Sequence, residues 1–116
     1  MNVFKLVNEA KKVCPDFDII LDPYDLTIVW ADPKSLSKIG WTPKDLVGKQ
    51  AFKFTTLNHT KVLEIAVKFL HGVFWRPVTL ICKDGSHIKC KIKTCKINFD
   101  GQLYLCKKFI PVKKLV

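Results

Sequence analysis

Apolar residues near the N-terminus recur at helical spacing. They are Val3, Leu6, Val7, Ala10 and Val13. Their separations of three, one, three and three positions predict an amphipathic helix over residues 3–13. Cys14 precedes Pro15 and should end this helix, because a residue before proline disfavours the helical conformation. A helix this short is marginal in water on its own, so its apolar stripe needs a surface to pack against.

Two strand-like runs follow, FDIILD (17–22) and LTIVWA (26–31), with the turn Pro23-Tyr24-Asp25 between them. The stretch WADPKSLSKIGWTPKDLVGK (30–49) then starts a helix twice and ends it twice. Asp-Pro and Thr-Pro are helix starts, because Asp or Thr can cap free amides and proline fits the first turn. Gly40 and Gly48 are helix ends. We therefore predict two short helices directly after the second strand.

Three strand-like runs come after a longer helix predicted over residues 57–70. The runs cover residues 74–83, 86–97 and 102–112. An Asp-Gly pair separates each run from the next, which is a strong hairpin signal. In the middle run Ile88, Cys90, Ile92 and Thr94 alternate with lysines, so the apolar set should face the helices and the lysines should face outward.

Two details of these runs predict a cover on the second face of the sheet. Cys95 and Ile97 share the parity of the lysines, so we expect a bulge or altered burial between Lys93 and Ile97. In the last run both parities are apolar, which indicates a strand covered on both sides. The N-terminal stripe, from the same chain or from a partner, is the candidate cover.

This order of elements resembles the PAS domain, a sensory and protein-interaction module. The residues that carry the resemblance are IILDPYDLTIVWADPKSLSKIGWTPKDLVGK (19–49) and LICKDGSHIKCKI (80–92). Asp32 stands where PAS sequences usually have Asn, and Trp41 where they usually have Tyr. The resemblance covers roughly residues 15–110. It implies an α+β fold with a five-stranded antiparallel sheet, helices on one face and an N-terminal amphipathic helix.

The chain is long enough for one domain with a core of its own. We expect a capping or dimerisation helix at residues 1–14, the PAS domain at 15–112 and a basic tail at 113–116. No apolar run approaches the roughly 20 residues needed to cross a bilayer, and the N-terminus does not read as a signal peptide. The expected location is the cytoplasm, with no membrane association.

The chain has a formal net charge of +10. Such a charge permits an alternative function, a nucleic-acid-binding protein that uses a lysine-rich sheet face. The lysines in question are Lys89, Lys91, Lys93, Lys96, Lys107 and Lys108. Only one residue is arginine, Arg76, whereas surfaces that read guanine or clamp phosphate favour arginine. The composition therefore favours lysines that solubilise a sheet face, and nucleic acid is the less favoured partner.

The five cysteines are odd in number and none forms a CxxC pair, which favours buried structural thiols over metal ligands or disulfides. PAS light sensors hold flavin or another chromophore through a cysteine, and this chain has none between Cys14 and Cys82. A covalent adduct is therefore not expected. Haem through His59 is the remaining cofactor candidate, because this residue shares a helix face with Val62 and Leu63. His87, after an Asp-Gly turn, should be exposed.

An enzyme is not expected, since the acidic residues mostly occupy turns and helix caps and no Gly-rich phosphate loop is present. The resemblance implies a small-ligand site between sheet and helices. Strand and helix parity together with PAS placement assign its lining to Trp30, Trp41, His59, Ile65, Phe69, Cys90 and Thr94. The predicted packing or dimer surface consists of Val3, Phe4, Leu6, Val7 and Ala10. The expected partners are a second copy of the chain, a small molecule and an effector domain of a parent protein.

Overall fold

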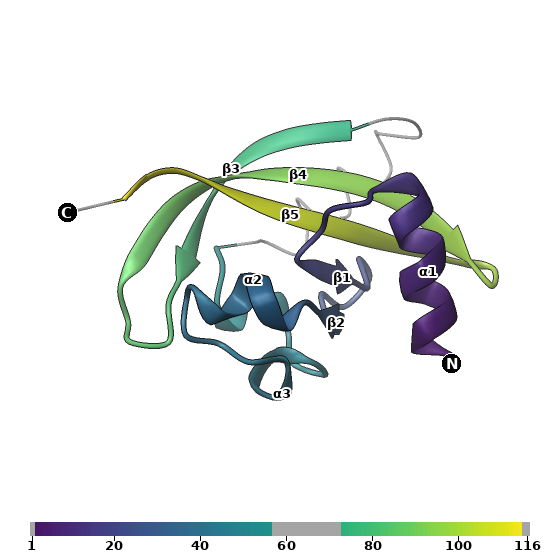
Figure 1. Cartoon of the computed structure of the whole chain (residues 1–116), viewed down its shortest axis with the longest axis horizontal. Helices are drawn as coiled ribbons and strands as arrows, with labels where there is room; N and C mark the ends of the chain where they lie inside the picture. Colours follow the sequence, from purple (N-terminus) through teal and green to yellow (C-terminus); the bar gives the residue numbers. More distant parts are fainter. Residues whose placement is uncertain (1, 57–72, 115–116) are drawn as a thin grey trace.

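A five-stranded antiparallel sheet in the order β2-β1-β5-β4-β3 organises the chain (Figure 1). This computed structural model describes residues 2–56 and 73–114. The elements are α1 (Val3–Val13), β1 (Ile19–Leu21), β2 (Ile28–Ala31), α2 (Pro33–Ser37), α3 (Pro43–Leu46), the 3₁₀ helix η1 (Ala51–Lys53), β3 (Val73–Ile81), β4 (His87–Phe99) and β5 (Gln102–Lys114). The helix predicted over residues 57–70 lies outside the described residues.

The two short helices begin at the predicted capping residues and end at Ser37 and Leu46, shortly before the predicted glycines. Asp32 caps α2 through the Ser35 amide, and Thr42 forms a reciprocal capping box with Asp45 at the start of α3. Gly40 has φ +82° after α2, a conformation that glycine adopts without strain. A Cβ at this glycine would come within 3.2 Å of Lys83 Cβ, so its small size also lets the loop after α2 approach the β3–β4 hairpin.

Two register shifts shape the sheet. One lies between Ile20 and Leu21 in the pairing of β1 with β2. The other lies between Lys89 and Cys90 in the pairing of β4 with β5. From Cys90 to Phe99 that pairing is continuous, so there is no bulge at Lys93–Ile97. The predicted alternative, altered burial, is what the structure has there.

Two apolar clusters lie on opposite faces of the sheet. The inner core lies under α2, α3 and η1 and includes Ile19, Leu21, Leu36, Leu46, Phe54, Leu80, Cys90, Ile92, Leu105 and Phe109. The outer core lies under α1 and comprises Leu6, Val7, Ala10, Cys14, Phe17, Ile20, Cys95, Ile97, Tyr104 and Cys106. Neighbouring residues of β5 therefore alternate between the two cores, which confirms the prediction of a strand covered on both faces.

The predicted α+β fold class is confirmed. β5 continues to Lys114, so the segment expected as a basic tail begins as strand, with Lys113 opposite Lys89. Among residues 2–56 and 73–114, no helix is long and apolar enough to cross a membrane.

Candidate ligand-binding groove

A groove of about 230 Å³ opens between α2 and the strands β3, β4 and β5. Its floor consists of Leu36, Ile39, Leu80, Ile88, Cys90 and Phe109. Leu36 and Ile39 face the sheet because α2 starts at its Asp32 cap and ends before Gly40. The strand residues face the helix because they share the inner parity of the sheet. The groove is therefore an apolar slot in the edge of the inner core.

Asp18 forms one polar end of the groove and is only 4% exposed. One of its carboxylate oxygens accepts the Phe109 amide at 2.7 Å, and the other lies 3.4 Å from Lys108 Nζ. Lys108 Nζ also lies 3.3 Å from Asp16. Burial opposes the charge of this lysine, but the carboxylates of Asp18 and Asp16 outweigh it and raise the pKa of Lys108 above its usual value.

The same contact closes the free edge of β5. Within residues 2–56 and 73–114, this strand has no partner strand on the β1 side beyond Lys107, since β1 pairs with Leu105–Lys107. The Phe109 amide, which points to the free edge, already donates to the Asp18 carboxylate. Pro111, the next residue of the same parity, has no backbone N–H. At these two positions an added strand from another chain would find no donor, so this part of the edge favours a small ligand over a peptide that extends the sheet.

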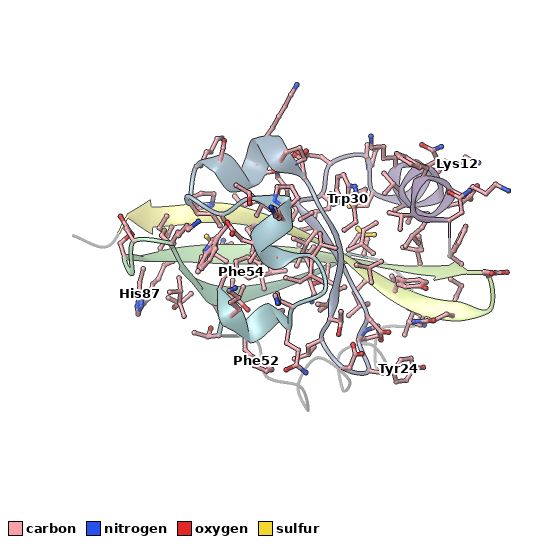
Figure 2. All side chains as sticks on the ribbon, turned by 90° about the horizontal axis from the view of Figure 1, so that it is seen from below. Lys12, Tyr24, Trp30, Phe52, Phe54 and His87 are labelled. Carbon is pink, nitrogen blue, oxygen red and sulfur yellow. The ribbon has the colours of Figure 1, made fainter. Side chains whose placement is uncertain are left out.

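The groove continues into a more open and more polar hollow beside the β3–β4 hairpin. Lys38, Ile39 and Ile88 line both parts. His87 lies in this hollow and is exposed, as predicted from its position after the turn. Figure 2 shows it at the end of the molecule away from α1.

The structure separates the residues predicted to line a ligand site. Cys90 lies on the groove floor, where burial and the charge of Asp18 raise the pKa of its thiol to about 11. Trp41 packs against the inner core and donates from Nε1 to the Ile81 carbonyl at 2.8 Å, outside the groove lining. His59, Ile65 and Phe69 lie outside the described residues, and with them the haem prediction.

The assignment of Trp30 to the ligand side is wrong. Its side chain packs against the outer core, in an edge-on contact with Phe17 at 5.3 Å between ring centroids. The cause is the register shift in the β1–β2 pair: Ile20 lies opposite Trp30, whereas Leu21 lies opposite Ile28. The extra residue reverses the parity of β2, so that Trp30 shares the outer face with Ile20.

Thr94 is buried on the inner face, as predicted, but its neighbour there is a lysine. Lys107 lies opposite it on β5, is 1% exposed and donates from Nζ to Thr94 Oγ1 at 3.0 Å. The nucleic-acid alternative counted Lys107 among the lysines of the sheet face, and its burial contradicts that placement. Its strand position gives it the parity of Leu105 and Phe109, which both belong to the inner core.

The lysines considered for nucleic acid do not form one surface. Lys89 and Lys91 are exposed, Lys107 is buried in the interior and Lys108 is held by two carboxylates. A phosphate backbone needs cations that are accessible together on one face. The structure removes two of the six lysines from that role.

Most of the predicted N-terminal stripe packs against the sheet of the same chain. Leu6, Val7 and Ala10 are buried in the outer core, and Val3 packs against it. Phe4 is 84% exposed and lies outside this buried stripe. Of the two surfaces proposed for the helix, its own sheet is therefore the one that the buried residues contact.

All five cysteines are buried, in agreement with structural thiols. Cys14, Cys95 and Cys106 form a group beneath the C-terminal end of α1, with Cys95 directly opposite Cys106 in the sheet. Burial is the main cause that raises the pKa of both Cys14 and Cys106 to about 12. These thiols therefore remain protonated and weakly nucleophilic at neutral pH.

Sequence reasoning missed the polar end of the groove. Asp18 was assigned to the acidic residues of turns and caps, although it lies within the apolar run FDIILD. An acidic residue inside a strand-like run was the available signal, because a buried carboxylate requires partners. The partners themselves, Lys108 and the Phe109 amide, lie about 90 residues away and carry no mark in the sequence.

Similarity to known proteins is found in structure and not in sequence. No protein-family model matches the chain, and no curated protein matches it. The PAS domain of an HTR-like protein from Haloarcula marismortui has a TM-score of 0.65 at 15% identity, covering 93% of this chain and 92% of that one. The PAS domain of nitrogen regulation protein NR(II) from Vibrio parahaemolyticus has a TM-score of 0.62 at 19% identity, covering 84% and 86%.

A third solved structure comes from an animal. It is a variant of the PAS-B domain of Drosophila melanogaster Cycle with bound glycerol, with a TM-score of 0.64 at 14% identity, covering 83% of this chain and 99% of that one. At these identities the likeness concerns the fold, and it confirms the resemblance that the sequence motifs predicted.

Proposed function

We propose that this chain, whose fold is that of a PAS domain, is a regulatory sensor module that converts occupancy of the groove into a change at α1. The observation that carries the proposal is the pair of cores on one sheet. β5 sends Leu105 and Phe109 into the inner core, and Tyr104 and Cys106 into the outer core. Because close-packed interiors transmit strain, a ligand that displaces these strands from one side alters the packing on the other.

A direct connection between the groove and α1 supports this function. The segment from Cys14 to Asp18 links α1 to β1, and it carries both carboxylates that hold Lys108 at the polar end of the groove. A ligand that contacts Lys108 therefore affects the segment that follows α1 directly, and this effect does not depend on movement of the other strands.

We infer that the output is association with a second copy of the chain or with an effector domain of a parent protein, through the exposed side of α1. Phe4 supports this assignment, because an 84% exposed aromatic residue on a helix leaves apolar surface available for a partner. Light scattering of Phe4→Ser over a concentration series should show a lower mass than that of the unmodified chain. Asn8→Ser, an exposed position on the same helix, is the control. Equal masses for all three proteins would remove self-association through Phe4.

Filling the groove tests the sensing step. Ile88 is half-buried and lines the groove and the open hollow, so Ile88→Trp places an indole there as a fixed occupant. Hydrogen exchange of the α1 amides should then change severalfold. Val47→Trp, at a 41% exposed position outside the groove, should leave it unchanged. If the α1 amides exchange at the same rate in Ile88→Trp and in the unmodified chain, while unfolding midpoints agree, the two faces are not coupled and the proposed function fails.

A further inference from the structure

The volume of the groove sets the size of what it can hold. The whole groove, including its polar end at Asp18 and Lys108, has a volume of about 230 Å³, which corresponds to roughly eight groups of the size of a water molecule, at about 30 Å³ each. Leu36 and Ile39 on one side and Leu80, Ile88 and Phe109 on the other offer no hydrogen bonds from their side chains. The matching ligand part is therefore a short alkyl chain or a single aromatic ring.

The polar groups around the groove set the chemistry of the other end. The carboxylate of Asp18 is already engaged, because one of its oxygens takes the Phe109 amide and the other faces Lys108. A cationic ligand would have to displace Lys108 from a carboxylate whose side chain is only 5% exposed. The charged acceptor of the groove is thus unfavourable for a cationic ligand.

Donors remain available. Lys38 lines both parts of the groove, and no acidic side chain among residues 2–56 and 73–114 forms an ion pair with it. An ammonium group has three donors, and Asp16 and Asp18 occupy two of those of Lys108. Two cations at the rim therefore point to a ligand end that accepts hydrogen bonds and carries negative charge.

We propose that the groove binds a small amphipathic carboxylate, with its alkyl or aryl part between α2 and the sheet and its carboxylate at Lys38 and Lys108. This inference rests on the proposed function and names the ligand class of the same site. The formal charge of +10 favours the approach of such an anion over that of an amine of the same shape.

Octanoate is the probe, titrated into the full chain while amide resonances are followed by NMR. Shifts should concentrate at Leu36, Ile39 and Ile88. Octanoate should bind more tightly than 1-octanol, octylamine should bind most weakly, and added salt should weaken octanoate alone. Hexanoate has two methylenes fewer and should bind up to about 15-fold more weakly, at about fourfold per buried methylene.

Two pairs of variants locate the ligand. Lys38→Gln should weaken octanoate about two- to fivefold without affecting 1-octanol, as expected for an exposed charge pair. Lys34→Gln, on the same helix but outside the groove lining, should have no effect. Ile88→Trp should abolish binding, and Val47→Trp should preserve it; urea denaturation of each variant confirms that it remains folded.

Four results would overturn the inference. If 1-octanol or octylamine binds as tightly as octanoate or more tightly, the ligand class is not a carboxylate, and the groove is a site for another class. If the shifts spread away from α2 and the β3–β4 hairpin, or if binding survives Ile88→Trp, the ligand does not bind in the groove. If none of the three eight-carbon probes binds, both the ligand class and the location are wrong. The proposed function is judged separately, by hydrogen exchange at α1, so its failure is distinguishable from each of these results.

Discussion

Docking of α1 on its own sheet depends on Leu6, and replacement of this residue by alanine measures that dependence. Leu6 is 0% exposed within the outer core. Truncation of a buried leucine costs about 2–5 kcal/mol, because the transfer energy is lost and a cavity remains. With a urea m-value of about 1–3 kcal/mol/M for a small domain, the unfolding midpoint should fall by roughly 1–3 M. Alanine is the better helix former, so intrinsic helix propensity cannot account for a loss.

Asn8→Ala is the matched control on the same helix. Its side chain is exposed, so the free energy of unfolding should change by no more than about 0.5 kcal/mol. If α1 can detach while the rest stays folded, Leu6→Ala will show a smaller midpoint shift but much faster hydrogen exchange in α1. Equal midpoints for the two variants, together with unchanged α1 exchange, would refute the packing of this helix as described.

Three further predictions concern buried or capping groups. Asp18→Ala should lower the free energy of unfolding by about 1–3 kcal/mol in urea, because the buried Phe109 amide loses its acceptor. Asp16→Ala, whose side chain is 80% exposed, should cost less than about 1 kcal/mol. Hydrogen bonds from the Thr42 amide and hydroxyl, followed by the contact with Lys83, lower the pKa of Asp45 below its ordinary 3.8. The ionised Asp45 therefore stabilises the fold fully above pH 3.8, and this stabilisation is lost as the pH falls through the lower pKa of the folded state. Asp45→Asn should abolish this part of the pH dependence in thermal melts. All five cysteines are buried, so a thiol reagent should label none of them rapidly at neutral pH and all of them in denaturant, and rapid labelling of Cys14 in the native state would contradict a docked α1.

The order of elements could be predicted because local signals set it. The stripe from Val3 to Val13 and the proline after Cys14 give the bounds of α1 as observed. The capping residues Asp32 and Thr42 act within one turn of the helices they start, so the sequence displays them directly. Asp-Gly pairs act over two residues in the same way.

The candidate site was less predictable because it depends on distant contacts and on register. The Trp30 assignment failed through one extra residue in β2, and a bulge of this kind reverses which face every following side chain occupies. The nucleic-acid alternative counted Lys107 among the surface lysines, whereas its parity on β5 places it inward beside Thr94. Strand parity is the better guide to the face that a lysine occupies, provided that the register is known.

The charge balance at the polar end of the groove explains why Lys38 matters to the proposed ligand class. Lys108 alone faces two carboxylates, Asp16 and Asp18, so this end already carries one negative charge in excess. A ligand carboxylate bound to the remaining donor of Lys108 would raise that excess to two. Lys38 lowers the excess to one again only if it approaches the same carboxylate, which its position in the lining of the groove allows. The binding of a ligand anion therefore gains from both lysines, and that of a neutral ligand depends on neither.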